Sequence, residues 1–161
     1  MESIRLLVLA AAKDWCIHDL DVKLAFLNDE LAEMVFVRQP PSFAVKRAKH
    51  MVLRLRKALY GLRQAQRAWN AKLDATLGEL GLWCATEHAL YTRRRGKEEL
   101  AVDVYVDDLI ITGARTEDIN SFKREMAVHF RMSDLGALSY YLGIEVRWEG
   151  GTHARSERVR L

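Results

Sequence analysis

Two adjacent carboxylates interrupt an apolar stretch in the second half of the chain. Asp107 and Asp108 stand between a β-branched run that ends at Val106 and a second apolar run, Leu109 to Ile111. Runs of this kind predict two strands, with both acids at the bend between them. Two like charges held close together are unfavourable unless a cation or another partner neutralises them. The pair therefore indicates either a metal site or a solvated acidic turn.

A basic segment, Arg38 to Lys72, is the second candidate for chemistry. It contains ten of the 25 Lys and Arg residues and none of the 22 Asp and Glu residues. Phe43, Tyr60 and Trp69 are interspersed among these charges. Basic side chains mixed with aromatic ones are typical of a surface that contacts a phosphate backbone. A solvated charged face is the alternative interpretation.

Length and composition predict one α+β domain with a core of its own, because 50% of the 161 residues are apolar. No apolar run approaches the roughly 18 residues of a membrane span. Glu2 breaks the basic leader that a signal peptide needs, so we expect an intracellular protein, in a cytoplasmic particle or in the nucleus. Cys16 and Cys84 lie far apart and outside any metal-binding motif, which favours two ordinary thiols.

Helical periodicity predicts three helices that could support these residues. The first occupies the first dozen residues, the second extends from Leu62 to about Gly81, and the third begins with Thr116 as its cap. Their expected apolar faces are Ile4, Leu7, Val8 and Ala11 in the first, Leu62, Ala65, Trp69, Leu73, Leu77 and Leu80 in the second, and Ile119, Phe122, Met126 and Phe130 in the third.

Alternation of acids with apolar residues around Leu20 and Val22 predicts a strand, with Asp21 at or near its end. Helices packed on an antiparallel sheet follow, with residues 1–148 as one domain and residues 149–161 as a loose tail. The remaining expected elements are a short helix at 30–34, strands at 35–37, 51–59, 89–92 and 140–148, and a charged loop at 93–99.

Five separated strings allow these expectations to be compared with a known family. In order they are LDVKLAFLN (20–28), VFVRQPPSF (35–43), LYGLRQAQRAW (59–69), VYVDDLIITG (104–113) and DLGALSYYLGIEV (134–146). Together they resemble the reverse transcriptase of Ty1/copia-type retrotransposons, in particular the plant elements, over roughly residues 3–148. The resemblance implies a polymerase palm-like fold, with incomplete fingers and no thumb in this chain.

That family copies an RNA template into DNA from a primer and deoxynucleoside triphosphates, using two Mg²⁺ ions, within a polyprotein that also carries integrase and RNase H. The resemblance therefore implies nucleic-acid partners, while the lack of a long apolar run predicts no membrane partner. It makes Asp21, Asp107 and Asp108 the catalytic metal ligands, with Asp21 and Asp107 as the chief pair. Hard Mg²⁺ ions prefer carboxylate oxygens, and acids from two strands can hold both ions.

The resemblance also assigns roles around the incoming nucleotide and the nucleic acid. Phe26, five residues after Asp21, corresponds to the aromatic residue that blocks a ribose 2′-hydroxyl, and Gly61 and Gln64 belong to the segment that contacts the nucleotide. Lys123 is either a general acid for pyrophosphate or a solvated helix lysine, and we interpret Asp19 as a solvated edge charge. The expected phosphate contacts are Arg54 and Arg56 on one strand and Arg63 and Arg67 on one helix.

Four positions depart from the family pattern: Leu24, Asp29, Gln66 and Asp103. Asp103 matters most, because it adds a negative charge on the same strand as the YVDD motif where the family has Gly. We therefore expect a truncated remnant with reduced or no activity alone. The alternatives are a non-catalytic nucleic-acid-binding remnant that uses Arg38 to Lys72, and a domain whose acidic turn binds Ca²⁺ or nothing.

Overall fold

The structure, a computed structural model, describes residues 2–28, 30–48, 50–85, 90–141, 144–150 and 157–160. Its chain forms two compact units, one of Met1–Lys23 with Ala75–Leu161 and the other of Leu24–Asp74. Expectations for Asp29, for the start of the 89–92 strand, for the Leu-Gly pair at 142–143 and for most of the tail lie outside the described residues. Among those that are described, no helix is long and apolar enough to cross a membrane.

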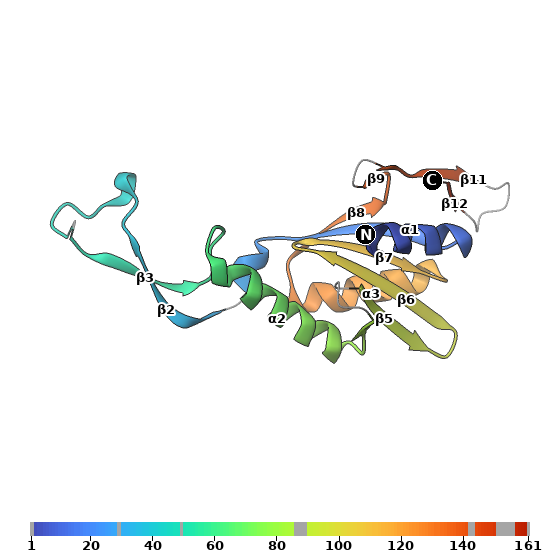
Figure 1. Cartoon of the computed structure of the whole chain (residues 1–161), viewed down its shortest axis with the longest axis horizontal. Helices are drawn as coiled ribbons and strands as arrows, with labels where there is room; N and C mark the ends of the chain where they lie inside the picture. Colours follow the sequence, from blue (N-terminus) through green and yellow to red (C-terminus); the bar gives the residue numbers. More distant parts are fainter. Residues whose placement is uncertain are drawn as a thin grey trace. The chain divides into compact units, whose positions relative to one another are not determined.

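The larger unit is built on a six-stranded sheet in the order β4-β5-β6-β7-β1-β8. Figure 1 labels β5, β6, β7 and β8 of this sheet. Every neighbouring pair is antiparallel, which confirms the predicted α+β class with an antiparallel sheet. The strands are β1 (Cys16–Val22), β4 (Trp83–Cys84), β5 (Leu90–Arg95), β6 (Glu98–Tyr105), β7 (Asp108–Gly113) and β8 (Met132–Ala137).

One face of this sheet is covered by α1 (Glu2–Ala12). Leu6, Leu7 and Ala10 on the helix form a buried cluster with Ile17 of β1 and Ile110 of β7. The predicted helix is confirmed. Of its predicted face, Leu7 and Ala11 pack on the core, but Ile4 and Val8 are 40% and 50% exposed. Apolar residues surround this helix on most sides, so periodicity alone could not select the buried stripe.

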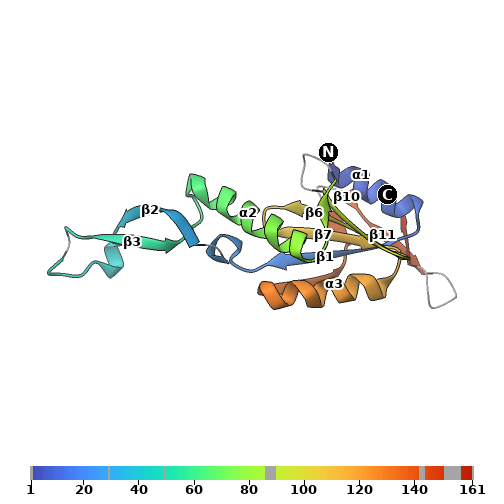
Figure 2. The ribbon, with the colours of Figure 1, turned by 90° about the horizontal axis from the view of Figure 1, so that it is seen from below.

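The opposite face is covered by α3 (Thr116–His129), and Figure 2 shows the two helices on opposite sides of β1, β6 and β7. All four residues of the predicted inward face are buried: Ile119, Phe122, Met126 and Phe130. Thr116 is the first helical residue and not the cap, which is Arg115 with no side-chain capping bond. Arg115 instead forms an ion pair with Asp118, a carboxylate that favours the positive end of the helix.

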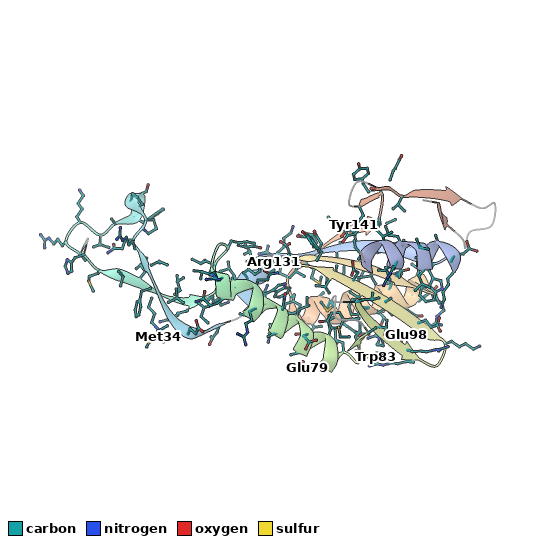
Figure 3. The ribbon with its side chains drawn as sticks, viewed as in Figure 1. Met34, Glu79, Trp83, Glu98, Arg131 and Tyr141 are labelled. Carbon is teal, nitrogen blue, oxygen red and sulfur yellow. The ribbon has the colours of Figure 1, made fainter. Side chains whose placement is uncertain are left out.

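The expected charged loop at 93–99 is wrong, because β5 continues to Arg95 and β6 begins at Glu98. Charge pairing across the hairpin explains the difference. Arg93 is only 2% exposed, and its guanidinium lies 2.6 Å from both Glu98 and Glu125 of α3. A buried guanidinium requires such partners, so the charges belong to packed strands and not to a solvated tip. Figure 3 labels Glu98 at the start of β6.

The smaller unit contains an antiparallel hairpin of β2 (Glu30–Arg38) and β3 (Val52–Lys57). The expected helix at 30–34 is wrong, since these residues extend β2, with a register irregularity between Glu30 and Val35. Short 3-10 helices η1 (Ala25–Asn28) and η2 (Pro41–Phe43) flank the strands, and α2 (Arg63–Glu79), the predicted second helix, begins in this unit. Side chains project from both sides of the hairpin, with Met34 70% exposed (Figure 3).

Beyond β8 the chain forms short strands instead of the single strand expected at 140–148. They are β9 (Tyr140–Tyr141), paired with β10 (Ile144–Glu145), and β11 (Arg147–Gly150), paired with β12 (Glu157–Arg160). The described end of the expected loose tail is thus a hairpin strand. Backbone pairing organises this segment where the charged sequence alone favoured a loop.

Candidate active site

The two acids of the YVDD motif lie where β6 turns into β7. Tyr105 and Asp108 are the last pair of the ladder, so Val106 and Asp107 form a two-residue turn. Val106 has φ 59, which a β-branched residue rarely adopts. Positive φ at the first turn residue matches the right-handed twist of the flanking strands, as in a type II′ turn. A strained turn therefore places consecutive carboxylates at the end of the hairpin.

Strand β1 brings Asp21 to this hairpin. It pairs with β7 so that Asp21 is directly opposite Asp108, at the last paired position. The backbone N–H of Val22 donates to the carbonyl of Asp107 at 2.8 Å, which ties the end of β1 to the turn. Opposed residues of neighbouring strands point to the same face of a sheet. The structure thus brings Asp21 and Asp108 together on one face and leaves Asp107 in the turn beside them.

Electrostatics show that these carboxylates affect one another. Burial raises the pKa of Asp108 above its ordinary value, and the negative charges of Asp107 and Asp21 raise it further. An acid whose charge is disfavoured by its neighbours attracts any cation that can neutralise them. The face is therefore prepared to hold positive charge.

Asp19 belongs to the same group, although the sequence interpretation made it a solvated edge charge. Strand β1 lies between β7 and β8, so Asp19 is on an internal strand and its Oδ1 is buried with no hydrogen-bond partner among the described residues. Burial raises its pKa, and the charges of Asp108 and Asp21 add to this effect. The alternation of acids in the sequence indicated that Asp19 and Asp21 share a face of the strand. It did not indicate that the strand is internal in the sheet, which is why Asp19 is buried.

Asp103, which we expected to depart from the family pattern, lies one row away on the same face. In the ladder Asp103 is opposite Ile110 of β7, and Ile110 is opposite Asp19 of β1. Asp103 is 3% exposed. A carboxylate at this position is therefore accommodated in the packed sheet beside the acidic group and not at its solvent edge.

Oxygen donors at this face are suited to a hard divalent cation, by charge and by the buried oxygen of Asp19. In the arrangement described, Asp21 forms an ion pair with the ammonium of Lys23. Over the described ranges, no three His, Cys, Asp or Glu side chains are gathered closely enough to hold a metal ion. The donor chemistry fits a cation, with Lys23 supplying the positive charge that Asp21 contacts here.

Lys123 lies on the other face of the sheet. It projects from α3, where its Nζ lies 2.8 Å from His18 Nδ1 and donates to Asp134 Oδ1 at 2.7 Å. Burial works to raise the pKa of Asp134, but the hydrogen bonds from Lys123 and the Gly136 amide, with the charges of Lys123 and His18, hold it below its ordinary value. His18 alternates with Asp19 and Asp21 along β1, so Lys123 is neither solvated nor directed toward the acids.

In the smaller unit, the predicted nucleotide-binding residues gather around an aromatic pair. The rings of Phe26 on η1 and Tyr60 lie 4.4 Å apart between centroids, at an interplanar angle of 55°. Tyr60 is followed by Gly61, whose φ of 91 is accessible to Gly at little cost. A Cβ at Gly61 would meet nothing within 4 Å, so the backbone conformation, and not lack of space, requires Gly there. The assignment of Phe26 and Gly61 to the nucleotide site stays a prediction, and the contact of Tyr60 with Phe26 was not predicted from the sequence.

Gln64 and the expected phosphate contacts occupy the same unit. The amide Nε2 of Gln64 donates to Glu33 of β2 at 3.1 Å. Arg54 and Arg56 share one side of β3 and, with Glu30 and Glu33, line a shallow pocket at the hairpin. Arg63 and Arg67 are exposed one turn apart at the start of α2. The basic side chains are therefore accessible, and the acids of β2 lie close to two of them.

Comparison with known proteins identifies the family. The family model described as reverse transcriptase (RNA-dependent DNA polymerase) matches residues 1–157. The chain is 38% identical over 162 residues to a retrovirus-related Pol polyprotein from transposon RE1 of Arabidopsis thaliana, covering 99% of this chain and 11% of that protein. It is 38% identical over 149 residues to the Pol polyprotein from transposon TNT 1-94 of Nicotiana tabacum, covering 91% of this chain and 11% of that protein.

A third relative, the transposon Ty5-1 protein of Saccharomyces cerevisiae, is 35% identical over 129 residues, covering 79% of this chain and 42% of its own length. No solved structure matches. The chain spans about a tenth of the length of the plant polyproteins, 11% in both cases. On the family match and these identities, the chain belongs to the reverse transcriptase family found in Ty1/copia-type retrotransposon Pol polyproteins.

Proposed function

We propose that this chain is the palm-type part of an RNA-directed DNA polymerase, which adds deoxynucleotides to a DNA primer along an RNA template. The observation that carries the proposal is the pairing of Asp21 with Asp108 beside the Asp107 turn. Acids from two strands, with the pKa of Asp108 raised by burial and by its neighbours, form the kind of cluster that phosphoryl transfer uses.

Asp21 and Asp108 would hold Mg²⁺, with Asp107 from the turn as a third donor. When bound, two such ions neutralise charge on the attacking primer 3′-hydroxyl and on the leaving pyrophosphate. Asp19 adds negative charge to the same face. Lys23 neutralises Asp21 in the described arrangement, so its ammonium must leave Asp21 before the carboxylate can act as a ligand.

The smaller unit supplies binding. Phe26 limits the space at the ribose 2′ carbon, Gly61 and Gln64 contact the incoming nucleotide, and Arg54, Arg56, Arg63 and Arg67 contact phosphates. Support comes from the exposure of these arginines and from the aromatic contact that fixes Phe26. Arg guanidinium groups suit this role because their planar donors match phosphate oxygens.

Extension of a primed RNA template by the purified chain with Mg²⁺ tests the proposal. Asp108→Asn removes one charged ligand, so we expect extension to fall at least about a hundredfold. Glu117→Gln, an exposed carboxylate in the first turn of α3, is the matched control and should keep wild-type rates. Equal activity of Asp108→Asn and the wild-type chain would remove the assignment of the site.

Non-catalytic nucleic-acid binding is the second candidate, favoured by the basic residues exposed on β3 and α2. Binding without extension would support it. In that case affinity for a primed template should fall as salt rises. Replacing Arg54 and Arg56 by Gln should reduce the slope of that salt dependence by about one for each phosphate that the variant no longer binds.

A further inference from the structure

The pair formed by Phe26 and Tyr60 has a feature that the family motif does not explain: Tyr60 packs directly against the residue expected to exclude a 2′-hydroxyl. Its ring lies 4.4 Å from that of Phe26, tilted by 55°. Tilted aromatic rings in close contact attract each other and restrict each other's rotamers. A side chain held this way limits how far its neighbour can move aside.

Both partners of the contact are anchored by local structure. Phe26 is on η1, where the side-chain amide of Asn28 donates to the carbonyls of Leu24 and Ala25, each at 3.2 Å. The backbone N–H of Leu27 also donates to Leu24, at 2.8 Å. These bonds stabilise the tight turn that contains Phe26 and so fix the backbone position from which its side chain projects.

Tyr60 occupies the second position of a β-turn. The backbone N–H of Leu62 donates to the carbonyl of Leu59 at 3.2 Å, and Gly61 at the third position has φ 91. A type II turn requires positive φ at that position, which accounts for Gly61. The turn leads into α2 at Arg63, so Tyr60 is held at the start of a helix and remains 54% exposed.

We propose that Tyr60 is a specificity-positioning residue, which holds the Phe26 ring in place and so determines how strongly the chain distinguishes deoxyribonucleotides from ribonucleotides. The inference rests on the proposed function, because it assumes that Phe26 meets the ribose. The shape of a binding site can weaken the binding of a nucleotide with an added hydroxyl by roughly a hundredfold, provided that the side chain in its way does not move. Tyr60 keeps the Phe26 ring from moving, and the turn at Gly61 keeps Tyr60 in position.

Equilibrium binding of dGTP and GTP to the full chain with a primed template tests this. The readout is the dissociation constant of GTP divided by that of dGTP. We expect Tyr60→Ala to lower that ratio about tenfold by weakening rejection of GTP, and Tyr60→Phe, which keeps the ring, to preserve it within about twofold. Phe36→Ala is the matched control, since Phe36 is a 56% exposed aromatic residue of the same unit that lies outside the basic segment.

A double variant separates this inference from the proposed function. If Tyr60 acts through Phe26, the double variant with Tyr60→Ala and Phe26→Ala has the same ratio of dissociation constants as the single variant Phe26→Ala. An unchanged ratio in Tyr60→Ala, with a lowered one in Phe26→Ala, overturns the role of Tyr60 alone. An unchanged ratio in Phe26→Ala, or equal binding of both nucleotides by the wild-type chain, overturns the proposed role of Phe26 and this inference with it.

A structural measurement covers a Tyr60→Ala chain that does not fold. Nuclear magnetic resonance of the folded Tyr60→Phe and Tyr60→Leu variants reports on the Phe26 ring directly. The ring protons of Phe26 should keep their shifts in Tyr60→Phe and move in Tyr60→Leu, which removes the neighbouring ring current. Unmoved Phe26 signals in Tyr60→Leu would show that the two rings are not in contact and overturn the inference.

Discussion

The central strands of the six-stranded sheet are largely buried, whereas those of the β2–β3 hairpin are largely exposed. In the sheet, α1 and α3 cover the two faces, and Leu109, Ile110 and Ile111 are all 1% exposed or less. In the hairpin, Phe36 and Leu53 are 56% and 48% exposed. A two-stranded ribbon alone is marginal in water. The packed sheet therefore carries the acids of the candidate site, and the exposed hairpin carries Arg54 and Arg56, two of the expected phosphate contacts.

The largest expected effect follows from this difference in burial. Leu109→Ala in β7 should lower the free energy of unfolding by about 3 kcal/mol, because it leaves a cavity in a packed core. Leu53→Ala in β3, the same chemical change at an exposed position, should cost less than about 0.5 kcal/mol. Urea denaturation followed by circular dichroism measures both. Equal costs for the two leucines would contradict the contrast between the sheet and the hairpin.

The same contrast applies to charged residues. Arg93→Gln leaves Glu98 and Glu125 beside a buried position without their guanidinium, so we expect a loss of about 3 kcal/mol. Arg54→Gln on the exposed strand β3 should change stability by less than about 0.5 kcal/mol. Thermal unfolding of the two variants decides the point. A stable Arg93→Gln chain would show that the buried ion pairs contribute little.

A smaller effect is the pH dependence of stability, which differs between the carboxylates on the two faces of the sheet. The pKa of Asp108 is raised in the folded chain, so the folded state binds more protons and stability decreases as pH rises from the ordinary carboxyl value through the folded pKa. The pKa of Asp134 is lowered, so its stabilisation is present above its ordinary value and is lost as pH falls through the folded pKa. The carboxylates on opposite faces therefore give opposite slopes.

Measuring the free energy of unfolding across the acid range up to neutral pH in three chains tests these slopes. Asp108→Asn should flatten the decrease above the ordinary carboxyl pKa and stabilise the chain near neutral pH. Asp134→Asn should remove part of the loss at the acid end. If Asp108→Asn destabilised the chain at neutral pH, the repulsion assigned to the acidic face would be incorrect.

Local sequence was sufficient for the elements whose residues alternate or repeat clearly. The hairpin at Asp107 and Asp108, the strand ending near Asp21, and the buried stripe of α3 follow from apolar runs broken at defined positions. The helix α1 was predicted, but Ile4 and Val8 of its expected inward face are exposed, because its sequence is apolar on most sides. The segment at 30–34 was assigned to a helix because its extension of β2 depends on pairing with β3, which no local pattern contains.

The site was predictable in its residue types but not in its register. Nothing in the sequence determines that Asp108, and not Asp107, is opposite Asp21, because this depends on how β1 aligns with β7. Asp19 was taken for an edge charge because strand order is a tertiary property. The contact of Tyr60 with Phe26 was not predicted, because it joins two turns that are far apart in sequence, at positions 26 and 60.

The central claim is that Asp21 and Asp108 act together to hold a divalent cation, and Mn²⁺ binding measured by electron paramagnetic resonance tests it most directly. Asp21→Asn and Asp108→Asn should each weaken binding by roughly tenfold or more, and the double variant should lose less than the sum of the two free-energy losses, because each acid depends on the other. Glu117→Gln should bind as the wild-type chain does. Wild-type affinity in Asp108→Asn, or strict additivity in the double variant, would contradict the claim that the two carboxylates form one site.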